Sequence, residues 1–459
     1  MEYISTRNNK KSYSFRDIFL KGLAPDGGLF VPKRIQPFKQ DEINGLNKLS
    51  YNELAIEIIS KFSYTEFTEN ELKEIVNISY KNFRVKDVVE LKKYKDVNIL
   101  ELFHGPTLAF KDIAMQVIGN MYERILKKNN LSINIIVATS GDTGAAAISA
   151  IKNRKNMKIF VLHPENKISE VQRKFMTTVN SDNVFNIALE SNFDECQRFV
   201  KLMFADKKFC NEINMSGVNS INWVRIITQI VYYFFSYFKL NQEHKKINFV
   251  VPTGNFGDIY AGYIAKKMGL PIGKLIIATN DNDILHRVIN TGIYEPLKVK
   301  HTISPSMDIQ IASNFERLIF DICDCNSNKI IKLMDDLKNN GKFTLEKKYL
   351  DKIKEFFSSG SLSDTQTKSV IKSIFKREGV LIDPHTAVAI GVSDKIKIDG
   401  YNVILSTAHP AKFSNIVEKE TDIKPELPEN LKNILSDEER FDKIPKDLKK
   451  VQNYILKRV

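Results

Sequence analysis

The fold is decided by residues 133–148, which read INIIVATSGDTGAAAI. The apolar run at 133–138 predicts a buried strand, and the polar loop at 139–144 leads through two glycines into an alanine-rich segment typical of a helix. The same layout returns at residues 248–262, where the apolar run 248–251 is followed by the loop 252–258 and a second helical segment. Two such units predict an α/β protein in which helices cover a parallel sheet.

The rest of the chain extends this pattern and indicates its organisation. Further apolar runs of strand length occur at 158–162, 184–189, 275–279 and 403–406, with helical periodicity between them, as in residues 110–125. Before residue 97 the helical pattern dominates, in 46–62 and 71–83, while glycines and prolines at 22–32 predict a loop. We expect a helical N-terminal domain over 1–96, an α/β region over 97–421 and a charged helical tail over 422–459.

Composition excludes several classes of protein. The 459 residues carry 68 Lys and Arg against 55 Asp and Glu, a net charge of +13, which without a basic-aromatic cluster argues against nucleic-acid binding. The four cysteines, Cys196, Cys210, Cys323 and Cys325, are too few and irregular for a disulfide framework, and the histidines lack metal-ligand spacing. The N-terminus shows no secretory signal and the apolar run 226–238 is too short to span a bilayer, so we expect a cytoplasmic protein without metal or membrane partner.

The two glycine loops are candidate anion sites. A strand-to-helix junction places backbone N–H groups at the positive end of a helix, and glycine lets an anion approach them closely. The loops lack the G-x-G-x-x-G pattern, and Gly257 to Gly262 is followed by Tyr263 where a Walker loop needs Lys. A tight turn without a ligand remains the alternative for each loop. Together they suit a cofactor and a substrate that each carry an anionic group.

Two further residues are candidates for chemistry. Lys111, in the segment ELFHGPTLAFKD at 101–112, follows Ala109 and Phe110, and partial desolvation there would lower its pKa and favour the amine needed for a Schiff base. A solvated surface lysine is the competing interpretation. Thr407 follows the apolar run 403–406, at the strand end where ligands of open α/β sheets bind, although a plain turn residue would also fit.

These segments together resemble the threonine synthase family, pyridoxal-phosphate enzymes of the tryptophan-synthase-β fold group. The resemblance runs from YISTR at 3–7 to HPAKF at 409–413. The motifs that carry it lie at 27–32, 104–112, 139–144, 219–223, 252–258, 304–308 and 383–388. It implies a fold type II architecture with two open parallel-type sheets in a two-lobed catalytic region.

The resemblance also implies roles for individual residues. Lys111 would hold pyridoxal 5'-phosphate and shuttle protons, and Thr407 would hydrogen-bond the pyridine nitrogen. The cofactor phosphate would be bound by Gly254, Asn255, Phe256, Gly257 and Asp258. The substrate carboxylate would be bound by Ser140, Gly141 and Thr143, and the phosphate of the substrate by candidates that include Asn222 and Arg317. Asp142, also in the substrate loop, is expected to cap the following helix or to orient the loop.

The activity implied is conversion of O-phospho-L-homoserine and water to L-threonine and phosphate, the last step of threonine biosynthesis. One rival is a threonine-synthase-like phospho-lyase, which shares the fold, the lysine and the cofactor but releases a keto acid. A second is a non-catalytic basic binding protein on the same fold. The chain departs from the family pattern at NNKK (8–11), at Ser191 and at 388–391, which concerns loop shape. The oligomeric state is left open.

Overall fold

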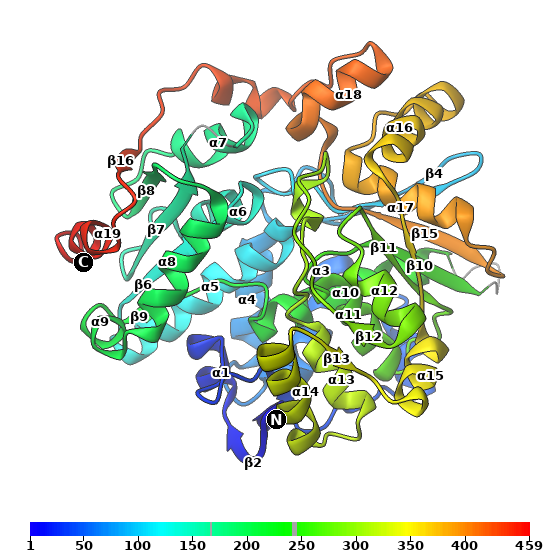
Figure 1. Ribbon diagram of the computed structural model, residues 1–459, viewed down its shortest axis with the longest axis horizontal. Helices are drawn as coiled ribbons and strands as arrows, with labels where there is room; N and C mark the ends of the chain where they lie inside the picture. Colours follow the sequence, from blue (N-terminus) through cyan, green and yellow to red (C-terminus); the bar gives the residue numbers. More distant parts are fainter. Residues whose placement is uncertain (166–167, 241–245) are drawn as a thin grey trace.

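Two open sheets form the centre of the computed structural model, which describes residues 1–165, 168–240 and 246–459 (Figure 1). The larger sheet has the order β14 (Phe357–Ser361), β11 (Leu275–Thr279), β10 (Ile247–Pro252), β15 (Tyr401–Ser406), β5 (Asn98–Glu101) and β4 (Glu90–Lys93). Its strands are parallel except β4, which is antiparallel to β5. The smaller sheet is parallel throughout, in the order β16 (Asp442–Ile444), β8 (Val184–Leu189), β7 (Met157–Pro164), β6 (Ile133–Ala138) and β9 (Met215–Ser216). The predicted α/β fold with two parallel-type sheets is confirmed.

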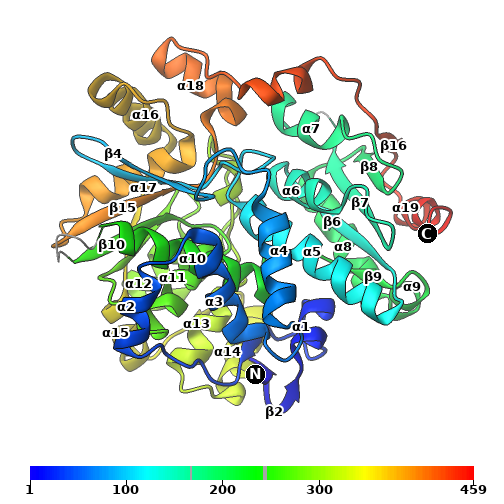
Figure 2. The same ribbon diagram turned by 180° about the vertical axis from the view of Figure 1, so that it is seen from behind.

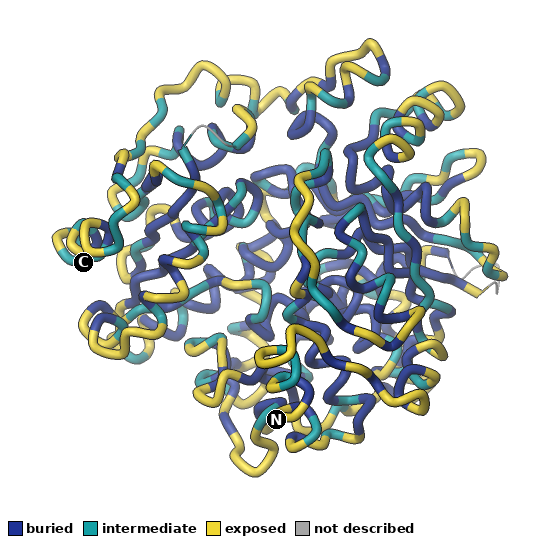
Figure 3. Tube along the Cα trace, in the orientation of Figure 1, coloured by how far each residue is buried: buried dark blue, intermediate teal, exposed yellow. Residues whose placement is uncertain are grey.

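The central strands are buried on both faces, which explains why they read as unbroken apolar runs. Every residue of β10 and β11 is buried. Figure 3 shows buried chain through the middle of both lobes and exposed chain on the surrounding helices and loops. The six strands predicted from apolar runs correspond to β6, β7, β8, β10, β11 and β15.

Helices cover both sheets. In the smaller lobe they are α5 (Lys111–Asn129), α6 (Asp142–Ile151), α7 (Glu170–Thr177), α8 (Phe193–Ala205) and α9 (Lys207–Glu212). The larger lobe has α10 (Trp223–Leu240), α11 (Gly257–Lys267), α12 (Ile284–Thr291), α13 (Phe315–Ile322), α14 (Ser327–Asn340), α15 (Lys347–Phe356), α16 (Asp364–Glu378) and α17 (Pro384–Lys395). A short ribbon of β12 (Ile293–Tyr294) and β13 (Phe343–Thr344) and the 3-10 turn η2 (Pro305–Met307) lie among them.

The N-terminal segment combines helices with a small sheet. Its helices are α1 (Phe15–Lys21), α2 (Gln40–Leu46), α3 (Tyr51–Ser63) and α4 (Glu69–Tyr80), and Ser50 and Thr68 begin α3 and α4 with capping boxes. The three antiparallel strands β1 (Tyr3–Ser5), β2 (Asn8–Tyr13) and β3 (Phe30–Pro32) were not predicted, and β3 occupies the end of the predicted loop. Helix α3 packs on α10 and α4 on α5, so the segment covers the face of the two lobes that Figure 2 shows in front.

The C-terminal segment is helical only in part. After the 3-10 turn η3 (Pro410–Phe413), α18 (Ser414–Thr421) and η4 (Glu429–Leu435) lead to β16, which pairs in parallel with β8, and to α19 (Leu448–Leu456). The tail therefore returns to the smaller lobe and extends its sheet (Figure 1). Within the described part of the chain, no helix has the length and apolar character needed to cross a membrane.

Candidate active site

Lys111 is held at the edge of the larger sheet by the segment that follows β5. The Phe110 N–H donates to the Thr407 carbonyl at 2.9 Å, and the His409 N–H donates to the Leu108 carbonyl at 3.1 Å. These bonds tie the start of α5 to the chain leaving β15. Two residues far apart in the sequence, Lys111 and Thr407, thus come together at the carboxyl ends of the parallel strands.

The side chain of Lys111 is buried among charged groups. Only 9% of the residue is exposed, and Nζ lies 3.5 Å from Asp142 Oδ2 and 5.0 Å from the centre of the Phe110 ring. Burial lowers the pKa of Lys111, and the positive charges of Arg225 and Lys412 lower it further, while Asp142 opposes the shift. The predicted desolvation of this lysine is confirmed, and the surface-lysine alternative is wrong.

Asp142 is the centre of a buried polar cluster between the lobes. Its Oδ1 pairs with Lys412 Nζ at 2.7 Å and accepts from Gln172 Nε2 at 3.1 Å, while Oδ2 faces Lys111 and accepts from Ser306 Oγ at 3.4 Å. Burial raises the pKa of Asp142, but Lys412 and Lys111 lower it by more, so that the pKa lies well below its usual range. The carboxylate is therefore ionised at neutral pH.

The expected capping role of Asp142 is not what the structure shows. Helix α6 has Gly141 as its N-cap, with no side-chain cap bond. Thr139 caps the start of the helix instead, because its Oγ1 accepts hydrogen bonds from the N–H groups of Gly141 and Gly144, both at 2.9 Å. Lys412, which also donates to the Thr107 carbonyl at 2.7 Å, is a site residue that the sequence reasoning missed.

The loop at the start of α6 keeps unused hydrogen-bonding groups. Ser140 and Thr143 are half-buried, and among the described residues neither side chain has a hydrogen-bond partner. Gly141 has φ +139°, and a Cβ there would lie 2.9 Å from Gln172 Cβ, so the turn requires glycine. Two free hydroxyls and the N–H groups of a helix start can bind a carboxylate here.

The loop between β10 and α11 has the geometry of a phosphate site. Phe256 is left-handed (φ 63°) and precedes α11, whose N-cap makes no side-chain hydrogen bond, which leaves N–H groups of the first turn for a ligand. A Cβ on Gly254 would lie 2.8 Å from the Ser306 carbonyl, so no larger residue fits. The Asn255 carbonyl accepts the Asn314 N–H at 3.1 Å and fixes the loop.

Asp258 directs its side chain away from the loop toward α10. Oδ1 accepts from the Tyr232 hydroxyl and, at 3.0 Å, from the Tyr233 hydroxyl, while Oδ2 has no partner among the described residues. Burial raises the pKa of Asp258 to about 6, although the two tyrosines, Lys111 and Arg225 oppose the shift. In the fold, Asp258 joins α11 to α10.

Thr407 stands where the resemblance needs a hydroxyl. It is 7% exposed, directly after β15, and its side chain has no hydrogen bond to any described residue. The preceding Ser406 Oγ lies 2.7 Å from Thr386 Oγ1, and His385 Nδ1 lies 2.6 Å from Asp383 Oδ2. These buried contacts fix the strand end and leave the Thr407 hydroxyl for a ligand.

Asn222 and Arg317 are occupied by the protein itself. Asn222 is fully buried; its amide donates to the Phe19 carbonyl at 3.1 Å, and its oxygen accepts a backbone N–H at 3.0 Å. Arg317 is also fully buried and donates to the carbonyls of Phe30 at 3.0 Å and Ile221 at 2.6 Å. These contacts join the N-terminal segment to the larger lobe and leave neither residue free for a phosphate.

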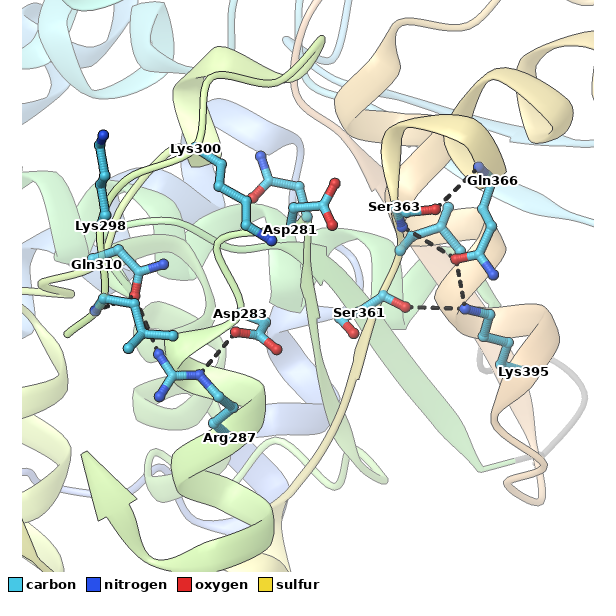
Figure 4. Close-up of a pocket in the computed structure, with 13 residues that line it drawn as sticks. Asp281, Asp283, Arg287, Lys298, Lys300, Gln310, Ser361, Ser363, Gln366 and Lys395 are labelled. Carbon is cyan, nitrogen blue, oxygen red and sulfur yellow. Dashed lines mark hydrogen bonds and ion pairs between the residues drawn. The ribbon is translucent and has the colours of Figure 1, made fainter. Parts of the chain in front are cut away.

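A separate pocket of about 370 Å³ opens beyond the carboxyl ends of β11 and β14 (Figure 4). Arg287 pairs with Asp283 at 2.9 Å on one side, and Lys395 donates to the Ser361 carbonyl on the other. None of the residues predicted from the sequence lines it. One lining residue, Asn280, donates to Ser304 Oγ at 3.0 Å and so connects the pocket to the segment that reaches Asp142.

A further cluster of two carboxylates and a histidine lies on β4, β5 and the loop that follows β5. The ligand atoms of Glu90, Glu101 and His104 lie within 4.8 Å of one another, which sequence spacing did not predict. Protein partners already engage them, because Lys92 pairs with Glu90 at 2.6 Å and His104 with Glu101 at 3.1 Å.

The residues around Lys111 fit pyridoxal phosphate. The site offers a buried amine of lowered pKa, a helix start with free N–H groups behind a glycine that a Cβ would block, and an unpaired hydroxyl at a strand end. These are the groups that the aldehyde, the phosphate and the ring nitrogen of that cofactor require.

Comparisons with known proteins agree with this geometry. Three family models match: threonine synthase N terminus over residues 2–80, pyridoxal-phosphate dependent enzyme over 95–406 and threonine synthase, C-terminal, over 386–455. The threonine synthase of Pseudomonas aeruginosa is 43% identical, over 99% of this chain and 98% of the relative. The crystal structure of pyridoxal-phosphate-bound threonine synthase from Brucella melitensis matches with a TM-score of 0.96 at 43% identity, covering 100% and 99% of the two chains. The yeast threonine synthase structure matches with a TM-score of 0.94 at 39% identity, covering 100% and 98%.

Proposed function

The chain belongs to the threonine synthase family and is a pyridoxal-phosphate-dependent lyase of fold type II, and from this premise we propose that it converts O-phospho-L-homoserine and water to L-threonine and phosphate. One observation supports this most strongly. A buried lysine of lowered pKa, Lys111, faces a helix start with two free hydroxyls and lies beside a second glycine loop. The site thus has separate places for a carboxylate and for a phosphate.

Lys111 is the residue that holds the cofactor and moves protons. The cofactor, when bound, supplies an electron sink that stabilises negative charge beside the reacting carbon. The protein supplies an amine whose neutral form is populated more than in water, because burial, Arg225 and Lys412 disfavour the charged form. The Phe110 ring covers one side of this amine.

The two glycine loops hold the anionic groups. The first-turn N–H groups after Phe256 bind the cofactor phosphate, and the Thr407 hydroxyl binds the ring nitrogen. The Ser140 and Thr143 hydroxyls, with the N–H groups of α6, bind the substrate carboxylate. The cofactor-phosphate site is shaped by Gly254, Asn255 and Gly257, and the substrate-carboxylate site by Gly141. Asp258 contributes to the cofactor-phosphate site through its main chain, since its side chain bonds to α10.

Asp142 and Lys412 set the electrostatics of the substrate loop. An ionised carboxylate near a substrate carboxylate would repel it, but the ion pair with Lys412 at 2.7 Å neutralises this charge. Asp142 also orients Lys111 from 3.5 Å. We assign these two residues the role of positioning Lys111 and the loop.

Product analysis tests the function. Purified protein is mixed with O-phospho-L-homoserine, and threonine, 2-oxobutyrate and phosphate are quantified in the same sample. Threonine equal to phosphate is expected. Phosphate matched by 2-oxobutyrate would instead indicate the phospho-lyase. If neither threonine nor 2-oxobutyrate forms, O-phospho-L-homoserine is not the substrate.

Lys111→Ala tests the assignment of the lysine. The variant should lose the visible absorbance of the bound cofactor and the turnover, with little loss of fold. Lys128→Ala, an exposed residue on the same helix, serves as the control and should keep both. A visible spectrum unchanged in Lys111→Ala would refute the assignment.

A further inference from the structure

Helix α7 contacts both the substrate loop and the C-terminal segment. On its inner face, Gln172, Phe175 and Met176 recur at three- and four-residue spacing, which places them side by side. On its outer face, Arg173 and Thr177 are four residues apart and meet the chain between η4 and β16. Figure 1 shows this chain, in red, passing α7 on its way to the smaller sheet. The helix therefore joins the C-terminal segment to the active site.

The inner face of α7 holds the substrate loop. Gln172 is 5% exposed, and its Nε2 donates to Asp142 Oδ1 at 3.1 Å. A Cβ on Gly141 would lie 2.9 Å from Gln172 Cβ, and a Cβ on Gly144 would lie 2.7 Å from Met176 Sδ. Helix α7 thus lies against the start of α6 at two points. A shift of α7 would displace the proposed carboxylate site at that helix start.

The outer face of α7 is fixed by the C-terminal segment. Arg173 makes a two-point contact with Glu439, from Nε to Oε2 at 2.7 Å and from Nη2 to Oε1 at 2.8 Å. The Thr177 hydroxyl donates to the same carboxylate at 2.7 Å, and Lys174 donates to the Leu435 carbonyl at 2.7 Å. The hydrogen bonds from Arg173 and Thr177 lower the pKa of Glu439 to about 2, so its carboxylate is ionised at neutral pH.

We infer that Glu439 and Gln172 are positioning residues for the substrate. Glu439 fixes α7 to the C-terminal segment, and Gln172 transmits the position of α7 to Asp142 and the carboxylate-binding loop. The inference rests on the proposed function where it names the substrate, whereas the contacts that hold α7 do not depend on it. A loop that binds the carboxylate equally in the ground state and the transition state affects KM and leaves kcat unchanged.

The test compares two neighbouring substitutions in the full-length protein. Glu439→Gln keeps the shape of the side chain and removes its charge. Glu438→Gln is the matched control, because Glu438 is exposed and makes no side-chain hydrogen bond or ion pair with any described residue. KM and kcat for O-phospho-L-homoserine are measured on protein saturated with pyridoxal phosphate, and cofactor affinity is measured by absorbance titration. Glu439→Gln should raise KM about 10-fold, with kcat and cofactor affinity within about twofold of wild type, and Glu438→Gln should match wild type.

Gln172→Ala separates positioning through α7 from a general loss of structure. This variant alone should also raise KM, because it removes the hydrogen bond between α7 and Asp142. Since Glu439 acts through Gln172, Glu439→Gln should change KM by less than about threefold when it is introduced into Gln172→Ala. Independent structural effects would multiply instead. Arg173→Lys keeps the charge without the two-point contact and should raise KM by less than Glu439→Gln does.

Amide hydrogen exchange of the cofactor-loaded proteins, without substrate, is the second readout. Peptides from α7 and from the start of α6 should exchange about 10-fold faster in Glu439→Gln than in Glu438→Gln, whereas those from α11 should be unchanged. A KM of Glu439→Gln within about twofold of wild type, full multiplication of the two KM effects, or unchanged exchange of α7 would overturn the inference. Absence of threonine from the wild-type reaction would refute the proposed function alone, since hydrogen exchange would still report on Glu439.

Discussion

The buried pair of Asp142 and Lys412 gives the sharpest test of how the site is held. Lys412 is 1% exposed and Asp142 4%, and their charged atoms lie 2.7 Å apart. Removing one member leaves the other charged and buried, which costs about 3–5 kcal/mol of unfolding free energy. We therefore expect Lys412→Met and Asp142→Asn each to destabilise the protein by about that amount.

The double variant should be much less destabilised than the sum of the two single variants. With both changes no buried charge of the pair is left. The Lys412 bond to the Thr107 carbonyl and the Asp142 contact to Lys111 are lost, and the asparagine oxygen can still accept from Gln172. Coupling of about 3 kcal/mol or more is expected, as for groups within one buried network.

The assay is urea unfolding of the four proteins without cofactor, followed by circular dichroism at pH 7. The pKa of Asp142 is held low in the folded state, so its contribution is present above the ordinary carboxyl pKa and is lost as the pH falls through the folded value. Single-variant effects below about 1 kcal/mol, or additive effects in the double variant, would refute the view that this pair is a buried, mutually dependent unit.

Three further predictions concern single residues of the site. The folded-state pKa of Asp258 is raised from 3.8 to about 6, so Asp258 increasingly disfavours folding as the pH rises from about 4 to 6, and fully so above 6. Asp258→Asn, which still accepts from Tyr232 and Tyr233, should be more stable than wild type by up to about 3 kcal/mol at pH 7 and equal to it near pH 4 in urea unfolding. A difference that does not change with pH would contradict this. Burial lowers the pKa of His409 to about 4, so the neutral ring is kept in the folded state while the unfolded chain binds a proton below about pH 6.5. His409 should therefore reduce the free energy of unfolding of wild type by up to about 3 kcal/mol as the pH falls from 6.5 to 4. His409→Asn, which can still cap the next turn, should remove that loss in urea unfolding. Thr407→Val should weaken binding of pyridoxal phosphate about fivefold in absorbance titrations, because one hydrogen bond of about 1 kcal/mol is lost; unchanged affinity would remove the hydroxyl from the cofactor site.

The sheets could be predicted because their strands are buried on both faces. The run Ile133–Ala138 was predicted with the bounds that β6 has, since an apolar stretch ending in a glycine loop has few other solutions. Strand β16 was missed because only Ile444 of its three residues is buried, so no apolar run marks it. Strand β2 was missed for the same reason, with Tyr13 its one buried residue.

The site was predictable where chemistry is local and not where it depends on packing. Phe110 and Ala109 beside Lys111 indicated desolvation, and the glycine loops indicated anion sites. Lys412 lies between Ala411 and Phe413 and Arg225 between Val224 and Ile226, the same local signal as at Lys111, but it was not followed there. Which of these cations meet one another and Asp142 is decided only when the lobes and helices pack together.

The central claim is that Lys111, and not the neighbouring Lys412, carries the cofactor. Borohydride reduction of the protein saturated with pyridoxal phosphate fixes the cofactor to the amine that holds it, and trypsin then fails to cut at that lysine. The account predicts a cofactor-modified peptide spanning residues 96–124, with Lys111 inside it. Modification of the peptide spanning residues 398–419, with Lys412 inside it, would contradict the account.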